Sequence, residues 1–364
     1  MSYKKRTRFV FATCLALFAG VMAWRGGLSA FRGVEPAMPA PAPSDIRFRV
    51  DFEAAQPAAR MSIALPPGYA FVPMPGAEAR ITAIDGRSGA VLEGGSFSLG
   101  AARPRKGGAF SFTVPRRSGA HPVIYSHPGL PAMRLVCLVP FEDDSADGRV
   151  DGVRIGAPPD PARGPEKVRR HRSLYVPPRR FVRLEPSVLG LSLSPAVRVG
   201  DLVCPSSDGR RHVSFAPVDY GLIRLVTEGW RRFSRLHPGL PRWSYISWYR
   251  TPSHNRREGG SRHSRHMYGD ACDMIIDADG DGRMDDLNGD GRVDRRDALL
   301  IAKLFEDIER GFPVRGGIGV YEYPGAASAG AAVHVDARGY RVRWGYSWLS
   351  GRKRSFVWYD EVDE

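Results

Sequence analysis

The sequence predicts an α+β fold in which an N-terminal all-β, sandwich-like domain precedes a mixed α+β domain. Its 364 residues are enough for two domains or three small ones. Short runs of alternating apolar residues fill positions 45–141, which is typical of the strands of a β-sandwich. The 41 Gly and 30 Pro residues supply many turns, and a helical spacing of apolar residues begins near residue 218.

The composition is that of a globular protein with an excess of basic residues. Hydrophobic residues make up 43% and charged residues 25%, which excludes a wholly disordered chain, a fibre and a polytopic membrane protein. The 53 Lys and Arg residues against 39 Asp and Glu residues give a net charge of +14. This surplus predicts an acidic partner, and nucleic acid, anionic lipid and anionic cell-wall polymer all qualify. Four Cys residues are too few for a disulfide scaffold.

Residues 1–30 predict an export segment. Four basic residues stand among the first eight, and an apolar run follows over positions 9–24. This run is shorter than the roughly 20 residues that span a bilayer core, so a cleaved signal ending near Ala30 and a single uncleaved membrane anchor remain alternatives. Either one would place the rest of the chain in the periplasm or cell envelope, and the anchor would hold it at the inner membrane.

The remaining chain divides into four stretches. Residues 31–44 are rich in Pro and Ala and predict an extended linker. The β-type runs of residues 45–141 are IRFRVDF, MSIAL, ARITAI, AFSFTV, HPVIYS and MRLVCLVPF. Residues 142–200 are polar and basic and predict a solvated connecting region, with contact to an anionic polymer as the alternative. The α+β domain covers residues 201–364 and starts with a helix over 218–236.

Side chains typical of metal ligands cluster in the last third of the chain. His266 and Asp273 are separated by a spacing that suits a loop leading into a strand, and Gly269 allows a tight turn between them. His334 stands far downstream in an apolar β-type run, where a buried imidazole needs a role. A close pair of ligands plus a distant third is typical of catalytic zinc sites, which keep a fourth position for water. We expect Cys272, beside this site, to be reduced and buried.

The residues around these three form a two-part motif. Its first part is Ser247, Tyr249, Arg250, Thr251, Pro252, Asn255, Gly259, Gly260, Ser264, His266, Gly269, Ala271 and Asp273. Its second part is Gly316, Gly317, Gly319, Tyr321, His334 and Asp336. With these spacings, roughly residues 215–347 resemble the zinc D-alanyl-D-alanine carboxypeptidase family, part of the larger group that includes hedgehog signalling domains. The resemblance implies a hedgehog/DD-peptidase-like α+β zinc peptidase domain.

The resemblance also implies a function and roles for single residues. It implies an exported zinc peptidase that hydrolyses peptidoglycan stem peptides or cross-links, as a D,D-carboxypeptidase or an endopeptidase. The residues that match the family's zinc ligands are His266, Asp273 and His334. Arg250 matches the arginine that faces a carboxylate or carbonyl oxygen of the substrate. Tyr249 and Ser264 are expected to support the substrate-binding wall.

The late motif departs from the family in one respect. Many relatives carry a His-x-His pair, or an acid three residues before the last ligand, where this chain has Asp336 and Ala331. We therefore predict Asp336 as the carboxylate that takes the proton of the attacking water, with Glu322 in reserve. The alternative is that Asp336 orients a metal ligand from behind.

An acidic insertion at residues 277–309 separates the second and third zinc-ligand candidates. It contains a twelve-residue pattern typical of calcium loops, followed by an apolar helix over 298–309. The loop positions 1, 3, 5, 7, 9 and 12 are Asp286, Asn288, Asp290, Arg292, Asp294 and Asp297. This half resembles dockerin-type repeats, and it predicts structural calcium, with a solvated acidic loop as the alternative. A second, overlapping loop begins at Asp277 and is expected to be incomplete.

These features favour an enzyme with zinc and calcium over two other classes. The alternatives are a non-catalytic peptidoglycan-binding protein and a calcium-dependent cell-surface scaffold. A nucleic-acid partner is not expected, because the chain carries an export segment and no recognition motif. Peptidoglycan is therefore the predicted partner of the basic surface, and the sequence makes no prediction of the oligomeric state.

Overall fold

A computed structural model describes residues 43–56, 58–100, 104–203, 213–238, 243–322, 330–345, 347–349 and 352–354. Within these ranges the fold is mixed α+β, and residues 41–364 form one compact unit. The predicted export segment lies outside the described residues, as does Cys204. Among the residues that are described, none of the helices has the length and apolar character needed to cross a membrane.

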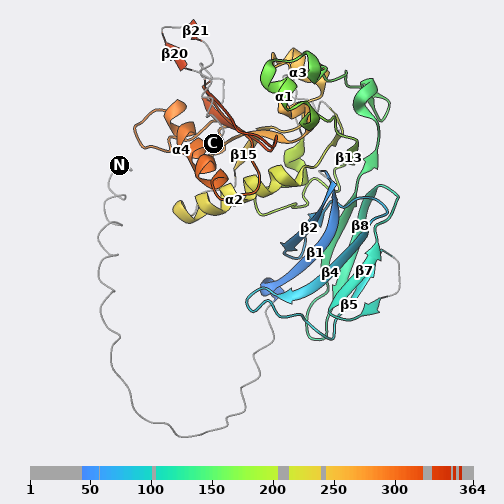
Figure 1. Ribbon diagram of the computed structural model, residues 1–364. Helices are drawn as coiled ribbons and strands as arrows, with labels where there is room; N and C mark the ends of the chain where they lie inside the picture. The colour runs from blue at the N-terminus through green and yellow to red at the C-terminus, as the bar shows by residue number, and fades with distance from the viewer. Residues whose placement is uncertain are drawn as a thin grey trace, which may run out of the picture. The chain divides into compact units, whose positions relative to one another are not determined.

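Two sheets are built from the six predicted β-type runs of residues 45–141 and from three short strands, β3 (Ala70–Phe71), β5 (Ser96–Leu99) and β6 (Arg105–Lys106), that the sequence patterns did not predict (Figure 1). The first has the order β2 (Ala58–Leu65), β1 (Ile46–Ala55), β4 (Glu78–Asp85), β7 (Ala109–Thr113). The second has the order β3, β9 (Met133–Val139), β8 (Gly119–Ser126), β5, β6. Buried and exposed side chains alternate along β1, as expected for a strand with one face in a core.

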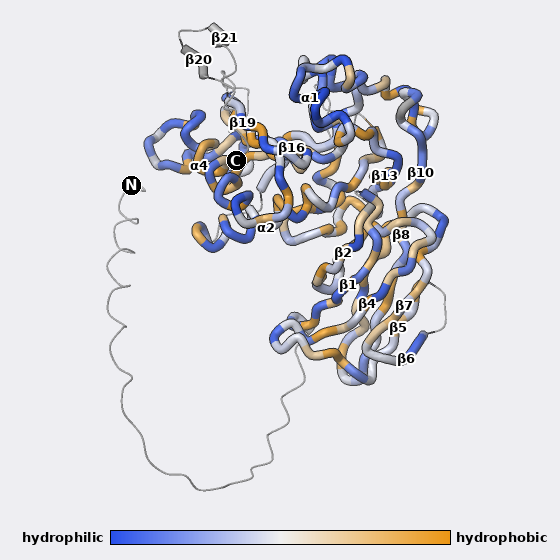
Figure 2. The backbone as a smooth tube through the Cα atoms, in the orientation of Figure 1, coloured by the Kyte–Doolittle hydropathy of each residue, from blue (hydrophilic) through white to orange (hydrophobic). Residues whose placement is uncertain are grey.

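Aromatic side chains join the two sheets. The ring of Phe48 on β1 lies 6.2 Å from that of Phe97 on β5 and 5.5 Å from that of Tyr125 on β8, measured between centroids. Both contacts are edge-on, the arrangement that the ring quadrupole favours. Figure 2 shows hydrophobic stretches along these strands, whereas the helices of the second half mix hydrophobic and hydrophilic residues.

The segment predicted to be a solvated connecting region contributes to the core. Its short elements are η3 (Ser145–Asp147), β11 (Arg149–Val150), β12 (Val153–Arg154), η4 (Pro161–Arg163), α1 (Glu166–Arg170), η5 (Arg172–Leu174), β13 (Arg180–Arg183) and η6 (Val199–Leu202). Strand β13 pairs with β10 (Phe141–Glu142) on one side and β14 (Phe215–Ala216) on the other. Phe181 on β13 is fully buried, and its ring contacts those of Phe141, Phe215 and Tyr249. Burial of this apolar surface holds the segment in the core although the segment is rich in polar residues.

A five-stranded sheet forms the centre of the second half. Its order is β15 (Ser244–Ser247), β16 (Ala271–Ile275), β18 (Ala331–Asp336), β17 (Gly317–Glu322), β19 (Val342–Gly345). All neighbours are antiparallel except β17 and β19, which are parallel. The remaining elements are η2 (Pro43–Asp45), α3 (Pro252–Arg257), η7 (Arg265–Tyr268), and the pair β20 (Ser347–Leu349) and β21 (Arg352–Arg354).

Two long helices accompany this sheet. Helix α2 (Tyr220–Leu236) matches the predicted helix and buries Leu222, Leu225, Val226 and Phe233 along one stripe. Helix α4 (Arg295–Glu309) packs on β17 and β18 and begins at a capping box. The register of the sheet pairs Asp273 on β16 with His334 on β18, so both side chains point to the same face.

Candidate functional site

A tight turn brings the first two candidate ligands together. His266 lies in η7, and Gly269 ends this helix in a left-handed conformation with φ of 80°. A Cβ at this position would lie 2.2 Å from Cγ of Pro217, so the turn requires a glycine for both its conformation and its space. The chain then enters β16, which carries Asp273. The predicted loop leading into a strand is therefore present.

Three atoms of His266, Asp273 and His334 converge on one point. Nε2 of His266 lies 3.2 Å from Nδ1 of His334 and 3.2 Å from Oδ1 of Asp273. Nδ1 of His334 lies 2.9 Å from the same carboxylate oxygen. Ligand atoms at zinc distances in a tetrahedron are about 3.3–3.4 Å apart, so this triangle has nearly the size that zinc requires. All three side chains are buried.

Hydrogen bonds on the far side of each ring set the protonation of the two imidazoles. Nδ1 of His266 donates to the carbonyl of Trp248 at 2.6 Å, and Nε2 of His334 donates to Oδ2 of Asp336 at 3.0 Å. The two nitrogens that face each other are therefore lone-pair acceptors, and Oδ1 of Asp273 is a third acceptor. Three converging acceptors without a proton between them repel one another, and a cation at their centre removes this repulsion.

Burial and neighbouring charges shift the pKa values of all three converging side chains. Burial, together with the positive charge of Arg250, lowers the pKa of His266 to about 4, so the ring is neutral near pH 7. Burial alone would raise the pKa of Asp273, but the nearby His266 and Arg250 hold it well below its usual range. For His334, burial lowers the pKa, and the carboxylates of Asp273 and Asp336 raise it by more, so that a proton on Nδ1 and a cation compete for the position between the three side chains.

Asp336 lies behind His334 with respect to the converging atoms. Its Oδ2 accepts from Nε2 of His334, and its Oδ1 accepts from the backbone N–H of Gly317 at 2.8 Å. Arg338 forms a salt bridge with the same carboxylate, which is fully buried. Asp336 thus contacts the ring nitrogen opposite the one that faces the other ligands. A role as proton acceptor for a metal-bound water stays a prediction, and this position favours the orienting role.

Glu322, the reserve candidate for the base, is carried by the other face of the sheet. Gly319 on β17 pairs with His334, whereas Glu322 pairs with Ala331. Because successive side chains of a strand alternate between faces, Glu322 and His334 point to opposite sides.

Arg250 lies beside the three converging residues. Its guanidinium donates to Oδ2 of Asp273, the oxygen turned away from the two histidines, and to Oγ of Ser247 at 2.7 Å. Tyr249, in contrast, is buried in the core against Phe181, and Ser264 directly precedes η7. The predicted contact of these two residues with substrate stays a prediction.

Several motif residues hold loops instead of entering the site. Thr251 accepts a hydrogen bond from the backbone N–H of His254 and caps α3. Asn255 donates through Nδ2 to the carbonyl of Ser261 at 2.9 Å, and a Cβ on Gly260 would lie 2.2 Å from Oδ1 of this asparagine. Their spacing therefore serves to place Arg250 and His266.

Trp344 is a site residue that the sequence interpretation did not include. Its ring lies 4.8 Å from that of His334 between centroids, and its Nε1 donates to the hydroxyl of Tyr321 at 3.0 Å. A Cβ on Gly319 would lie 2.3 Å from Cε2 of Trp344, so the glycine leaves the space that the indole fills. The closely spaced glycines of the late motif were the signal in the sequence that a large side chain packs against this strand.

The acidic insertion contains two loops with the same backbone pattern. In the predicted calcium loop, Asp286 accepts from the N–H groups of Gly289 and Gly291, while Asp297 accepts from those of Leu287 and Asp294. Asp290 and Asp294 form salt bridges with Arg296. The overlapping loop brings together carboxylate oxygens of Asp277, Asp279 and Asp285 within 4.8 Å. Calcium binding by the loop from Asp286 to Asp297 stays a prediction, as does the incompleteness of the overlapping loop.

The comparisons with known proteins agree with this geometry. Residues 239–286 match the family Peptidase M15. The matched stretch includes Arg250, His266 and Asp273 and ends before His334. It supports a metallopeptidase, and the zinc dependence of M15 peptidases is consistent with the His–Asp–His group. No curated protein and no solved structure matches the chain.

Proposed function

We propose that this chain is an exported zinc metallopeptidase that hydrolyses peptide bonds in peptidoglycan stem peptides or cross-links. The observation that carries the proposal is the convergence of two acceptor nitrogens and one carboxylate oxygen within 3.2 Å of one another. The M15 match, which includes His266 and Asp273 but ends before His334, supports a peptidase, and the +14 charge suits an anionic cell-wall polymer. Whether the activity is that of a D,D-carboxypeptidase or an endopeptidase is decided by the fragments released in the assay below.

Each residue of the proposed site has a different role in the reaction. Zinc held by His266, Asp273 and His334 would supply a Lewis acid and would lower the pKa of a bound water toward about 7. Arg250 holds the outer oxygen of Asp273 and is placed to face a substrate carboxylate or carbonyl oxygen with its planar donor group. Trp344 covers one side of His334 with an apolar ring, which keeps bulk water away from this ligand.

Asp336 and Arg338 act in this proposal as positioning residues. Asp336 fixes the tautomer and orientation of His334 through its Nε2–H, an arrangement typical of histidines that bind metals. Arg338 neutralises the buried carboxylate, which keeps Asp336 ionised and accepting.

Calcium binding by the acidic insertion is part of the proposal and has its own test. Ca²⁺ added to the purified protein should raise its melting temperature, because an ion that binds only the folded state stabilises it. Asp286→Asn should reduce this shift, and Asp51→Asn, on β1, should leave it unchanged. Equal shifts in the wild type and Asp286→Asn would contradict calcium binding at this loop.

Digestion of purified sacculi tests the peptidase. Fragments released by the wild type and by His266→Ala are analysed by mass spectrometry, and zinc content is measured on the same preparations. We expect D-alanine or cleaved cross-links with the wild type only, together with loss of zinc from His266→Ala. The exposed His237→Ala serves as control and should behave as the wild type does. A wild type that holds zinc, binds sacculi and releases nothing would instead support the non-catalytic binding protein.

A further inference from the structure

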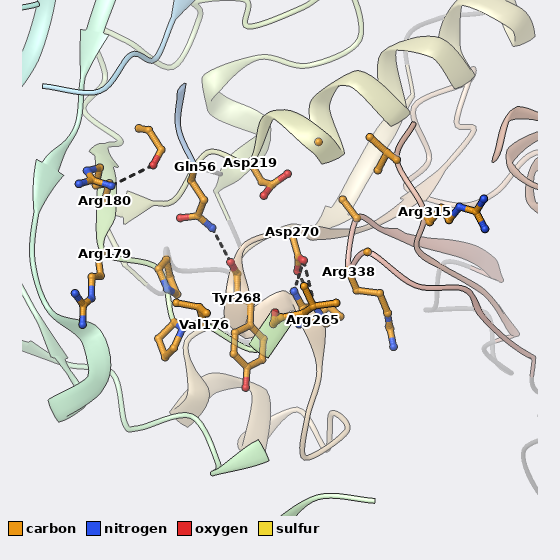
Figure 3. Close-up of a pocket in the computed structure, with 18 of the residues that line it drawn as sticks. Gln56, Val176, Arg179, Arg180, Asp219, Arg265, Tyr268, Asp270, Arg315 and Arg338 are labelled. Carbon is orange, nitrogen blue, oxygen red and sulfur yellow. Dashed lines mark hydrogen bonds and ion pairs between the residues drawn. The ribbon is translucent and has the colours of Figure 1, made fainter. Parts of the chain in front are cut away.

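A cavity of about 580 Å³ lies apart from the three converging ligands. Its walls come from residues 55–56, 174, 176–180, 219, 221, 313–315 and 337–339, together with side chains near η7 (Figure 3). None of the three metal-ligand candidates lines it. Its size falls within the range of about 300–1,000 Å³ that is typical of sites for small ligands. The cavity therefore has room for an occupant of its own.

Two buried carboxylates in the cavity wall differ in their partners. Asp270 is 5% exposed and forms a salt bridge with Arg265. Asp219 is 8% exposed and accepts the backbone N–H of Leu222 at 2.9 Å as the N-cap of α2. No Lys or Arg among the described residues forms a salt bridge with Asp219. The positive end of the helix offsets part of its charge.

Asp219 is therefore the buried carboxylate of this wall that lacks a basic side chain as partner within the described part of the chain. Asp270 is paired with Arg265, and the neighbouring Asp336, which does not line the cavity, is paired with Arg338 and His334. Burial and the neighbouring charge of Asp270 raise the pKa of Asp219 to about 7, which shows that the helix cap does not complete the compensation. A buried carboxylate of this kind is stabilised by a proton or by a cation. The cavity is the route by which a cation can reach it.

The rim of the cavity has the opposite charge. Arg179 and Arg315 are exposed, and in Figure 3 their side chains lie on opposite sides of the two carboxylates. Arg315 has no side-chain hydrogen bond or ion pair among the described residues, and Arg179 reaches only the exposed Asp144, at 3.7 Å. Apolar groups stand between rim and floor, among them Val176, which is 63% exposed.

We propose that this cavity is a second ligand site that binds a short peptide with a free amino group and a free carboxylate. The amino group lies against Asp219, the carboxylate contacts Arg315, which unlike Arg179 has no ion-pair partner among the described residues, and the side chains pack on Val176 and its neighbouring prolines. The site is separate from the proposed peptidase centre, and its occupation does not depend on zinc. Arg338 lines the cavity and also holds Asp336, so an occupant would contact the same residues that orient His334.

Calorimetric titration of the full-length, zinc-loaded protein with three peptides tests the proposal. The probes are trialanine, N-acetyl-trialanine, which lacks the amine, and trialanine amide, which lacks the carboxylate. We expect trialanine to bind and each blocked peptide to bind at least tenfold more weakly. Asp219→Asn should weaken trialanine binding about thirtyfold or more, the low end for removing one partner of a buried charge pair. Asparagine caps helices as well as aspartate does, so the fold should persist.

Two further variants separate this site from the metal site. Arg315→Gln should weaken binding of trialanine but not of trialanine amide, and His266→Ala should leave trialanine binding unchanged. Equal binding of free and acetylated peptide by the wild type, or no binding at millimolar concentration, would overturn the proposal, as would loss of trialanine binding in His266→Ala. The peptide comparison needs the wild type alone and holds even if Asp219→Asn does not fold.

Discussion

Asp336→Asn separates the two roles that are open for this carboxylate. In the structure, Oδ2 accepts from His334 at 3.0 Å, and Oδ1 accepts from the backbone N–H groups of Gly317 and Arg338 at 2.8 and 3.1 Å. An asparagine has the same shape but only one acceptor oxygen, so one of these donors must face an NH₂ group. The substitution also leaves the buried guanidinium of Arg338 without its anion.

The size of the effect follows from the orienting role. Loss of a carboxylate that orients a metal-bound histidine weakens metal binding or activity about 10–100-fold. We therefore expect zinc affinity, measured by competition with a chromogenic chelator, to fall by this factor, and kcat on muropeptides to fall with it. A general base would instead lose about 10²–10⁴-fold in kcat while zinc affinity stayed constant. That second result would refute the orienting role. Asp51→Asn is the control and should change neither quantity.

Three further predictions concern stability and packing. Arg265→Gln removes the partner of a buried carboxylate and should lower the free energy of unfolding by about 3–5 kcal/mol, whereas Arg262→Gln, at an exposed position, should change it by less than about 0.5 kcal/mol. Urea titration compares the two, and equal values would contradict this reasoning. Gly319→Ala places a Cβ 2.3 Å from the indole of Trp344, so we expect a shifted tryptophan emission and weaker zinc binding; an unchanged spectrum would speak against the contact. Because burial raises the pKa of Asp219 from 3.8 to about 7, the folded protein holds a proton there that the unfolded chain has released, and the contribution of this group to stability, measured as the difference between wild type and Asp219→Asn, should fall as the pH rises from about 4 to about 7. A pH-independent difference between variant and wild type would contradict it.

Local patterns in the sequence were sufficient for the two long helices and for the longest strands. The alternating run at the start of the β-rich stretch became β1, and the stripe of Leu222, Leu225 and Phe233 became the buried face of α2. Each of these patterns depends on neighbours a few residues apart, and such neighbours decide which side of an element is buried. The candidate ligands His266 and Asp273 were found for the same reason, since a short loop joins them.

The segment after the two sheets shows where composition is misleading. Its many charged residues predicted a solvated connection, yet Phe181 and its aromatic neighbours bury it in the core. Burial of a few large apolar side chains stabilises the segment in the core. The surrounding charged residues do not prevent this burial, because their long side chains can leave the charged ends in water.

The sequence by itself determined the longest strands, the main helix and the residue types of the candidate metal site. Only the tertiary structure decided how they act together. His334 meets Asp273 across 61 positions of chain, and that register sets which imidazole nitrogen faces the metal position and places Asp336 behind the ring. The uncompensated charge of Asp219 likewise emerges only when distant segments close around the cavity. These features depend on long-range pairing, and the residues that meet there carry no local signal of their partners.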